Sequence, residues 1–210
     1  MSHVKLILVR HGHVEGIKPE KFRGQIDLPL TERGRLQAKL TADYLHAITS
    51  FDAVYSSPLS RCVDTAMEIG ARQQRKPLIM PELIDINYGI WQGRERAAVA
   101  REDPARYRGW MIRPDMTVIP NADSLQAIQA SLIKALLAFR EQHDGNTIVA
   151  VGHDSSNRIM LLTALDMPLS RYWSLRQDPC GINIINFDGN RCTIDRINET
   201  GHLMTLPELS

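Results

Sequence analysis

The chain has 210 residues, which at about 150 residues per domain predicts a single domain over residues 1–210. Hydrophobic residues make up 43% and charged residues 23% of it, a composition that excludes a disordered chain. The net charge is only +1, so we expect no overall electrostatic attraction to nucleic acid or to a membrane surface.

No segment has the length or layout of a membrane anchor or a signal peptide. The longest stretch without Asp, Glu, Lys or Arg covers residues 124–133, about half of the roughly 20 residues that a membrane-spanning helix needs. Met1 leads directly into an apolar segment. The chain has an odd number of cysteines, Cys62, Cys180 and Cys192, and they do not have the spacing of metal ligands. We therefore expect them to be reduced thiols. We therefore expect a cytoplasmic protein with no membrane span.

Short apolar segments alternate with amphipathic ones along the chain, which predicts strands and helices in turn. Strands are expected at residues 4–9, 51–55 and 147–151, with a short one within 77–84. Helices are expected at 31–48, 58–73, 122–143 and 155–165, the first capped by Thr31 and with Leu36 and Leu45 on its apolar face. Asp188-Gly189-Asn190 would join a terminal hairpin of residues 182–187 and 192–197. This order predicts an α/β fold with a mostly parallel sheet covered on both faces.

Polar residues follow the ends of the predicted strands, and these ends share one edge of a parallel sheet. Arg10-His11-Gly12 follows the first strand, Ser56-Ser57-Pro58-Leu59-Ser60-Arg61 follows the second, and Gly152-His153-Asp154 follows the fourth. Ligands of open α/β sheets bind beyond the carboxyl ends of the strands. Two arginines, two imidazoles and two helix starts favour an anion there. Because guanidinium binds phosphate oxygens in pairs, we expect a phosphoryl group.

Each of these residues also has a purely structural interpretation. A single histidine at a strand end is usually packed or capping, Asp154 has the position of a helix N-cap, and Arg61 fits a helix surface. Their coincidence at one edge of one sheet favours a functional site over separate structural roles.

Five segments resemble the histidine phosphatase superfamily, the phosphoglycerate mutase-like group. They are Leu8-Val9-Arg10-His11-Gly12, Leu30-Thr31-Glu32-Arg33-Gly34, Tyr55-Ser56-Ser57-Pro58-Leu59-Ser60-Arg61, Tyr88-Gly89-Ile90-Trp91-Gln92-Gly93 and Val151-Gly152-His153. The resemblance covers nearly the whole chain, in the order of the family. It implies a three-layer α/β/α sandwich with a small helical cap inserted at about residues 94–121.

The resemblance also implies a mechanism that needs neither a metal nor another cofactor. His11 would attack phosphorus and become a phosphohistidine, which water would then hydrolyse. Arg10, Arg61 and His153 would hold the phosphoryl oxygens and stabilise the charge of the transition state. The further substrate-binding candidates are Arg23, Gly24 and Asp154.

A leaving alkoxide needs a proton, so this mechanism needs a general acid. The family usually has Glu four residues before the Gly of its Gly-x-Trp-x-Gly segment, and here that position is Asp85. Asp is one methylene shorter, which displaces the carboxyl by roughly 1.5 Å. Asp85 is the first candidate, with an exposed loop acid as its structural alternative. Asp154 is the second, because another branch uses an Asp directly after its second His, and Glu82 is the third.

Some positions depart from the family pattern. The family often has Glu and Asn two and six residues after the nucleophilic His, where this chain has His13 and Ile17. Six arginines against three acids give residues 94–113 a net charge of +3 in the region of the cap. This segment would recognise a substrate with a second anionic group, or would be a solvated helical surface.

We therefore predict a hydrolase of small soluble phosphomonoesters, either of broad specificity or, from residues 198–203, close to α-ribazole-phosphate phosphatase. A phosphoglycerate mutase is one alternative, although the cap is short for an enzyme that must keep its phosphohistidine from water. A phosphoryl-binding protein without catalysis is another. A metallohydrolase using His11 and His13 is a third, although Arg10 and Arg61 would repel its cation. The sequence leaves a homodimer open.

Overall fold

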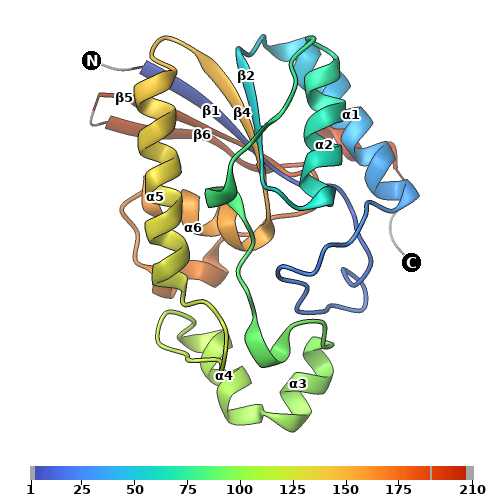
Figure 1. Cartoon of the computed structure of the whole chain (residues 1–210), viewed down its shortest axis with the longest axis vertical. Coiled ribbons are helices and arrows are strands. Elements are labelled where there is room, and N and C mark those ends of the chain that lie inside the picture. The colour runs from blue at the N-terminus through green and yellow to red at the C-terminus, as the bar shows by residue number, and fades with distance from the viewer. Residues whose placement is uncertain (1–2, 190, 207–210) are drawn as a thin grey trace.

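The computed structural model describes residues 3–189 and 191–206, in which strands and helices alternate (Figure 1). The strands are β1 (His3–Arg10), β2 (Ala53–Ser56), β3 (Leu78–Ile79), β4 (Thr147–Gly152), β5 (Ile182–Asp188) and β6 (Arg191–Glu199). The α-helices are α1 (Glu32–Ile48), α2 (Ser60–Ala71), α3 (Arg96–Glu102), α4 (Pro104–Ile112), α5 (Leu125–Gln142) and α6 (Asp154–Ala164). Short 3-10 helices are η1 (Pro81–Leu83), η2 (Gly89–Trp91), η3 (Leu169–Ser174) and η4 (Gly201–Leu203).

The six strands form one sheet in the order β3-β2-β4-β1-β5-β6. The first four are parallel, whereas β5 is antiparallel to β1 and β6 is antiparallel to β5. The register pairs Arg10 with Gly152 and Ser56 with Val151, so β1, β2 and β4 end at the same edge. The residues that follow these three strands therefore leave the sheet side by side.

Helices cover both faces of the sheet, with α1 and α2 on one face and α5 and α6 on the other (Figure 1). Successive side chains of β1 alternate between the faces, because Leu6 and Leu8 pack toward α5 and α6 while Ile7 and Val9 pack toward α1 and α2. Each such buried side chain contributes about 1.5–3 kcal/mol. The predicted α/β/α fold with a mostly parallel sheet and a terminal hairpin is confirmed. Asn190 of the predicted turn lies outside the described residues.

Two helices start later than the apolar pattern predicts, each for a local reason. The helix expected from residue 58 begins at Ser60, because Leu59 is extended with φ −73° and ψ 138°. The helix expected from residue 122 begins at Leu125, because Ser124 is its N-cap and accepts a hydrogen bond from the Ala127 N–H at 3.1 Å. The strand expected within residues 77–84 is shorter than that range and comprises Leu78–Ile79.

The buried face of α1 differs from the predicted one. Leu36 is 46% exposed, whereas the small residues Gly34 and Ala38 are buried with Leu45. Small side chains are needed on this face because the first turn of α1 lies directly against the loop after β1. The predicted N-cap is confirmed, since the Thr31 hydroxyl accepts a hydrogen bond from the Gly34 N–H at 3.1 Å.

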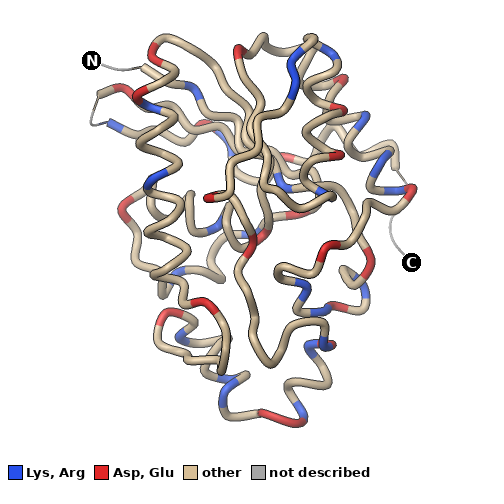
Figure 2. The backbone as a smooth tube through the Cα atoms, in the orientation of Figure 1, with Lys and Arg blue, Asp and Glu red and all other residues tan. Residues whose placement is uncertain are grey.

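Helices α3 and α4 lie together at one end of the molecule, beyond the carboxyl edge of the parallel strands (Figure 1). Basic and acidic positions are interspersed along this segment (Figure 2). Its ion pairs join Arg94 to Glu102 and Arg106 to Asp103. Arg96 and Arg113 pair with Glu20 and Asp115, which lie outside residues 94–113, so four of the six arginines have an acidic partner. The function of residues 94–121 as a cap stays a prediction. Among the described helices, none is long and apolar enough to cross a membrane.

Candidate active site

His11 and His153 meet where β1 and β4 end. Their ring centroids are 5.3 Å apart and the rings are inclined at 62°. Both side chains are buried, with exposed fractions of 1% and 0%. The parallel register of β1 and β4 is what brings them together, because it aligns Arg10 with Gly152 and so the residue after each.

The His11 ring is held in one tautomer. Its Nδ1 lies 2.7 Å from the Gly12 carbonyl oxygen, and because that oxygen can only accept, Nδ1 carries the proton. Nε2 is then left with a free lone pair. Burial, together with the positive charges of Arg61 and Arg10, holds the pKa of His11 well below its usual value. His11 is therefore a neutral imidazole with a nucleophilic nitrogen at pH 7.

Two glycines allow the loop after β1 to pass close to the first turn of α1. A Cβ atom on Gly34 would lie 2.1 Å from the His13 carbonyl oxygen, and one on Gly12 would lie 2.5 Å from the Gly34 carbonyl oxygen. Both distances are below any real carbon contact. Gly34 weakens the first turn of the helix, but this close approach requires it.

Arg61 is fully buried and its guanidinium is fixed from several sides. It lies in the first turn of α2 and donates from Nη1 to the Ile26 carbonyl and from Nη2 to the Gly24 carbonyl, each at 2.7 Å. Nη2 also lies 3.4 Å from an Asp85 carboxylate oxygen. Gly24 has φ +51° and no room for a side chain, because a Cβ there would lie 2.4 Å from Gln92 Oε1. Gly24 thus positions Arg61 through its backbone.

His153 is the N-cap residue of α6 and is held by a hydroxyl. Its Nε2 lies 2.7 Å from Ser57 Oγ, and Cys62 Sγ lies 3.4 Å from the same nitrogen. On the other side of the ring, Nδ1 lies 3.8 Å from Asp85 Oδ2. Burial and then Arg61 lower the pKa of His153 well below its usual value, so this ring is also neutral at pH 7.

The three candidate acids occupy different environments. Asp85 is 7% exposed and, among the described residues, is the acid within 4 Å of both Arg61 and His153. Burial raises the pKa of Asp85, which Arg61 and Arg23 oppose. Asp154 instead pairs with Arg158 at 3.0 Å. Glu82 lies on η1 and is half-buried.

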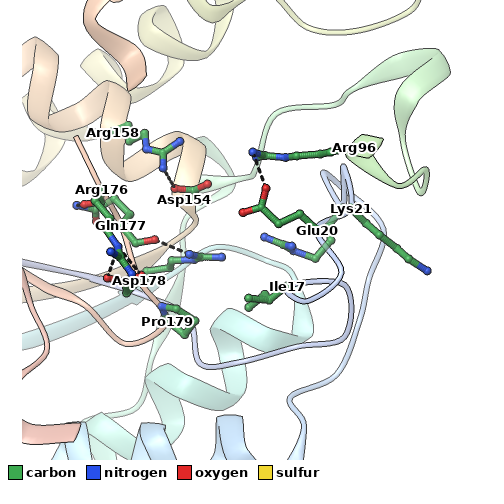
Figure 3. Close-up of a pocket in the computed structure, with 12 residues that line it drawn as sticks. Ile17, Glu20, Lys21, Arg96, Asp154, Arg158, Arg176, Gln177, Asp178 and Pro179 are labelled. Atoms are coloured by element: carbon green, nitrogen blue, oxygen red, sulfur yellow. Dashed lines mark hydrogen bonds and ion pairs between the residues drawn. The ribbon is translucent and has the colours of Figure 1, made fainter. Parts of the chain in front are cut away.

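A cavity of about 230 Å³ lies next to Arg10 and Asp154, the chain neighbours of His11 and His153, and its lining residues are drawn in Figure 3. Of the predicted site residues, Arg10, Arg23 and Asp154 line it. Arg10 donates from Nη1 to the Gln177 carbonyl, and Arg23 donates from Nη1 to the Gly16 carbonyl at 2.6 Å. Burial and the nearby Arg10 lower the pKa of Arg23 to about 10. Positive charge from Arg10 and Arg23 therefore lines the cavity.

Comparison with known proteins agrees with this arrangement. The profile of the histidine phosphatase superfamily (branch 1) matches residues 6–200. The chain belongs to this superfamily. It is 33% identical over 200 residues to phosphoserine phosphatase 1 of Hydrogenobacter thermophilus, covering 95% of this chain and 94% of the relative. It is 26% identical to the adenosylcobalamin/alpha-ribazole phosphatase of Escherichia coli, covering 93% and 96%.

A solved structure of the same fold is the phosphoserine phosphatase of Entamoeba histolytica in complex with 3-phosphoglyceric acid. It superposes with a TM-score of 0.86 at 27% identity, covering 95% of this chain and 99% of that one. The superfamily match, together with relatives that are phosphatases, identifies this chain as a phosphatase, as the sequence predicts.

The two residues that depart from the superfamily pattern have separate environments. The His13 ring bonds to Thr31 Oγ1 at 2.9 Å, and its backbone N–H donates to Gln37 Oε1 at 2.8 Å. His13 therefore faces the start of α1, whereas His11 faces His153. Ile17 lines the cavity. Over residues 3–189 and 191–206, no three His, Cys, Asp or Glu side chains gather as metal ligands would.

Three contacts of this site were not identified from the sequence. The motif that contains Ser57 assigns this residue no role, although its hydroxyl contacts His153. The Gln177 carbonyl that holds Arg10 lies in an irregular segment with no sequence signal. Arg158 lines the cavity, and its spacing of four residues from Asp154 on a predicted helix could have indicated their pairing.

Proposed function

We propose that this phosphatase hydrolyses phosphomonoesters through a covalent phosphohistidine on His11. The lone pair on Nε2 attacks phosphorus, the bond from phosphorus to the ester oxygen breaks, and the alcohol leaves with a proton from a general acid. Water then attacks the phosphohistidine, releasing inorganic phosphate and restoring the neutral ring. The anchoring of Nδ1 by the Gly12 carbonyl carries this proposal, because it leaves Nε2 unprotonated before substrate arrives.

The positive charge for this reaction comes from side chains. Arg10 and Arg61 would bind phosphoryl oxygens, and both have a buried Nε without a hydrogen-bond partner among the described residues. His153, whose Nε2 contacts the Ser57 hydroxyl, would lie against the phosphoryl group beside His11. Arg23 would add a further positive charge at the entrance. Guanidinium groups fixed in a buried site stabilise developing charge without reorganising.

Asp85 is our candidate for the general acid. Its raised pKa keeps a larger protonated fraction near neutral pH than an exposed Asp has. Its contacts with Arg61 and His153 support this role, because these two residues would hold the phosphoryl oxygens. Asp154 is less suited, because its carboxylate is held by Arg158 at 3.0 Å.

The substrate we propose is a small soluble phosphorylated metabolite. A cavity of about 230 Å³ suits a compact alcohol portion better than a macromolecular one. The printed names of the relatives suggest phosphoserine and α-ribazole phosphate as compounds to test, together with a broad panel of phosphomonoesters. Cytoplasmic location, the absence of nucleic-acid binding and the homodimer stay predictions.

Trapping the covalent intermediate tests the mechanism. Enzyme mixed with a substrate labelled in its phosphoryl group and quenched under alkaline denaturing conditions should carry label on His11. The His11→Ala variant should lose both label and activity, whereas His46→Ala, on the exposed side of α1, should keep both. An active His11→Ala variant would overturn the proposal. Activity should persist in a chelator, and release of free phosphate rather than an isomer separates a phosphatase from a mutase.

A further inference from the structure

Asn183 is a buried amide in the middle of an apolar strand. It lies in β5 between Ile182 and Ile184, and its exposed fraction is 0%. Asparagine is depleted in strands, and burying an amide is unfavourable unless its hydrogen bonds are made inside the protein. The contacts of this side chain therefore indicate its role.

The Asn183 amide makes all the hydrogen bonds that an amide can make. Its Nδ2 donates to the Leu8 carbonyl at 3.0 Å and to Gln177 Oε1 at 2.9 Å. Its Oδ1 accepts from Gln177 Nε2 and from the Asn198 N–H, both at 2.9 Å. An amide has two donor hydrogens and two acceptor lone pairs. The four contacts therefore fix the plane of this side chain and leave none of its polar atoms free.

The partner of Asn183 is Gln177, in the loop that precedes β5. Residues 175–181 contain no helix or strand, so side-chain contacts determine where this loop lies. The two bonds between the Gln177 and Asn183 amides join it to the centre of the sheet. In β6, Asn198 Oδ1 accepts from the Asp178 N–H at 2.6 Å, and Asn198 Nδ2 donates to the Asp178 carboxylate at 2.8 Å. Two asparagines of the terminal hairpin thus hold the loop in place.

The same loop holds Arg10 at two points. The Gln177 carbonyl accepts a hydrogen bond from Arg10 Nη1, and the Gly181 carbonyl accepts one from the Arg10 N–H at 3.2 Å. Arg10 and Gln177 both line the cavity (Figure 3). Within the described part of the chain, Arg10 Nε has no hydrogen-bond partner. The Gln177 carbonyl therefore determines the direction in which this guanidinium presents its remaining donors.

We infer that the amide pair of Gln177 and Asn183 positions Arg10 for the reaction. This inference rests on the proposed function, since it takes Arg10 to bind the phosphoryl group. Both amides act through the Gln177 carbonyl, so both residues are positioning residues. A displacement of about 1 Å in a binding group can cost about 10²-fold in rate. Loss of the pair should therefore lower activity although every atom of Arg10 is still present.

Gln177→Ala tests the inference, because it removes the side-chain amide and keeps the carbonyl to which Arg10 donates. With p-nitrophenyl phosphate as substrate, the variant should lose about tenfold or more in kcat/KM. Unchanged kcat/KM would overturn the inference.

Gln73→Ala is the matched control, because it removes the same amide from a site at the other edge of the sheet. Before β2, Gln73 Nε2 donates to the Thr49 carbonyl at 2.9 Å and Gln73 Oε1 accepts from the Phe51 N–H at 3.0 Å. The control should keep the wild-type kcat/KM, with thermal unfolding comparing the stability of the two variants. An equal loss of kcat/KM in the control would show that activity follows stability, which would refute the role of Gln177.

A double-mutant cycle separates positioning from a purely structural role. In an Arg10→Ala background there is no guanidinium to position, so adding Gln177→Ala should change kcat/KM by less than about twofold. A purely structural amide pair would cost the same factor in both backgrounds, and that result would refute the inference. Asn183→Ala should repeat the pattern of Gln177→Ala, and fully additive effects of the two would contradict a single pair. If Asn183→Ala does not fold, Gln177→Ala decides.

The mobility of the Arg10 side chain tests positioning without turnover. The order parameter of its Nε–H group, from ¹⁵N relaxation, should fall in Gln177→Ala and keep its wild-type value in Gln73→Ala. If no ester releases phosphate, the hydrolase proposal fails and this measurement still decides whether the pair holds Arg10. If phosphate is released and the order parameter is the same in wild type and Gln177→Ala, the hydrolase proposal stands and the inference is refuted.

Discussion

Replacing Asp85 with Asn tests the general acid with little change in shape. The amide oxygen can still accept the hydrogen bond that the carboxylate takes from the Ile86 N–H at 3.0 Å. The substitution removes the proton that Asp85 would donate, beside Arg61 at 3.4 Å and His153 at 3.8 Å. The loss should therefore depend on how much the leaving group needs that proton.

The expected magnitude differs between two classes of ester. A general acid contributes about 10²–10⁴-fold to the rate when the leaving group is a basic alkoxide. Asp85→Asn should lower kcat/KM for an alkyl phosphate by a factor in this range. For p-nitrophenyl phosphate, whose phenolate leaves without protonation, the same variant should lose far less. The wild-type rate with the alkyl ester should fall as pH rises through the raised pKa of Asp85, and this alkaline limb should be absent from the variant.

The assay is phosphate release from both esters across a pH series, with thermal unfolding as the check on folding. Asp154→Asn and Glu82→Gln are the matched comparisons, because they test the other two candidate acids. An equal loss with both esters in Asp85→Asn would show that Asp85 is structural or binds substrate. A leaving-group dependence in Asp154→Asn instead would transfer the role to that residue.

Four further predictions concern the groups around the nucleophile. Ser57→Ala removes the hydroxyl that contacts His153 Nε2 at 2.7 Å and should lower kcat by about three- to tenfold; unchanged kcat would show that the ring needs no such partner. Gly34→Ala places a Cβ 2.1 Å from the His13 carbonyl oxygen and should lower the free energy of unfolding by about 1–3 kcal/mol. Urea denaturation measures this change. A variant as stable as the wild type would contradict the close approach. Burial and nearby cations lower the pKa of His11. The value of kcat/KM should therefore stay constant as pH falls to 6.5 and decline only well below pH 6.5. A midpoint of this decline at or above pH 6.5 would contradict a neutral nucleophile. The same lowered pKa means that the unfolded chain binds more protons below about pH 6.5, so the free energy of unfolding should also fall there.

Much of the fold and part of the site follow from local pattern. The buried strands appear in the sequence as short apolar segments because both of their faces are covered. In β1, Leu6 is buried on one face of the sheet and Ile7 on the other. The superfamily motifs lie where such strands end, so the sequence alone places His11 and His153 at one edge of the sheet. The error at Leu36 has a physical cause, since apolar periodicity does not show that a close helix approach needs small residues such as Gly34 and Ala38.

The sequence by itself determined the order of elements, the parallel sheet and the edge at which the imidazoles and arginines gather, because these depend on periodicity and on strand ends. Only the tertiary structure decided which side chains and carbonyl groups contact each site residue. The Gly24 and Ile26 carbonyls that fix Arg61, the hydroxyl of Ser57 on His153 and the stacking of Arg158 on Trp173 each join residues more than 10 positions apart. Such contacts depend on the paths of loops, which have no repeating pattern for a sequence to reveal.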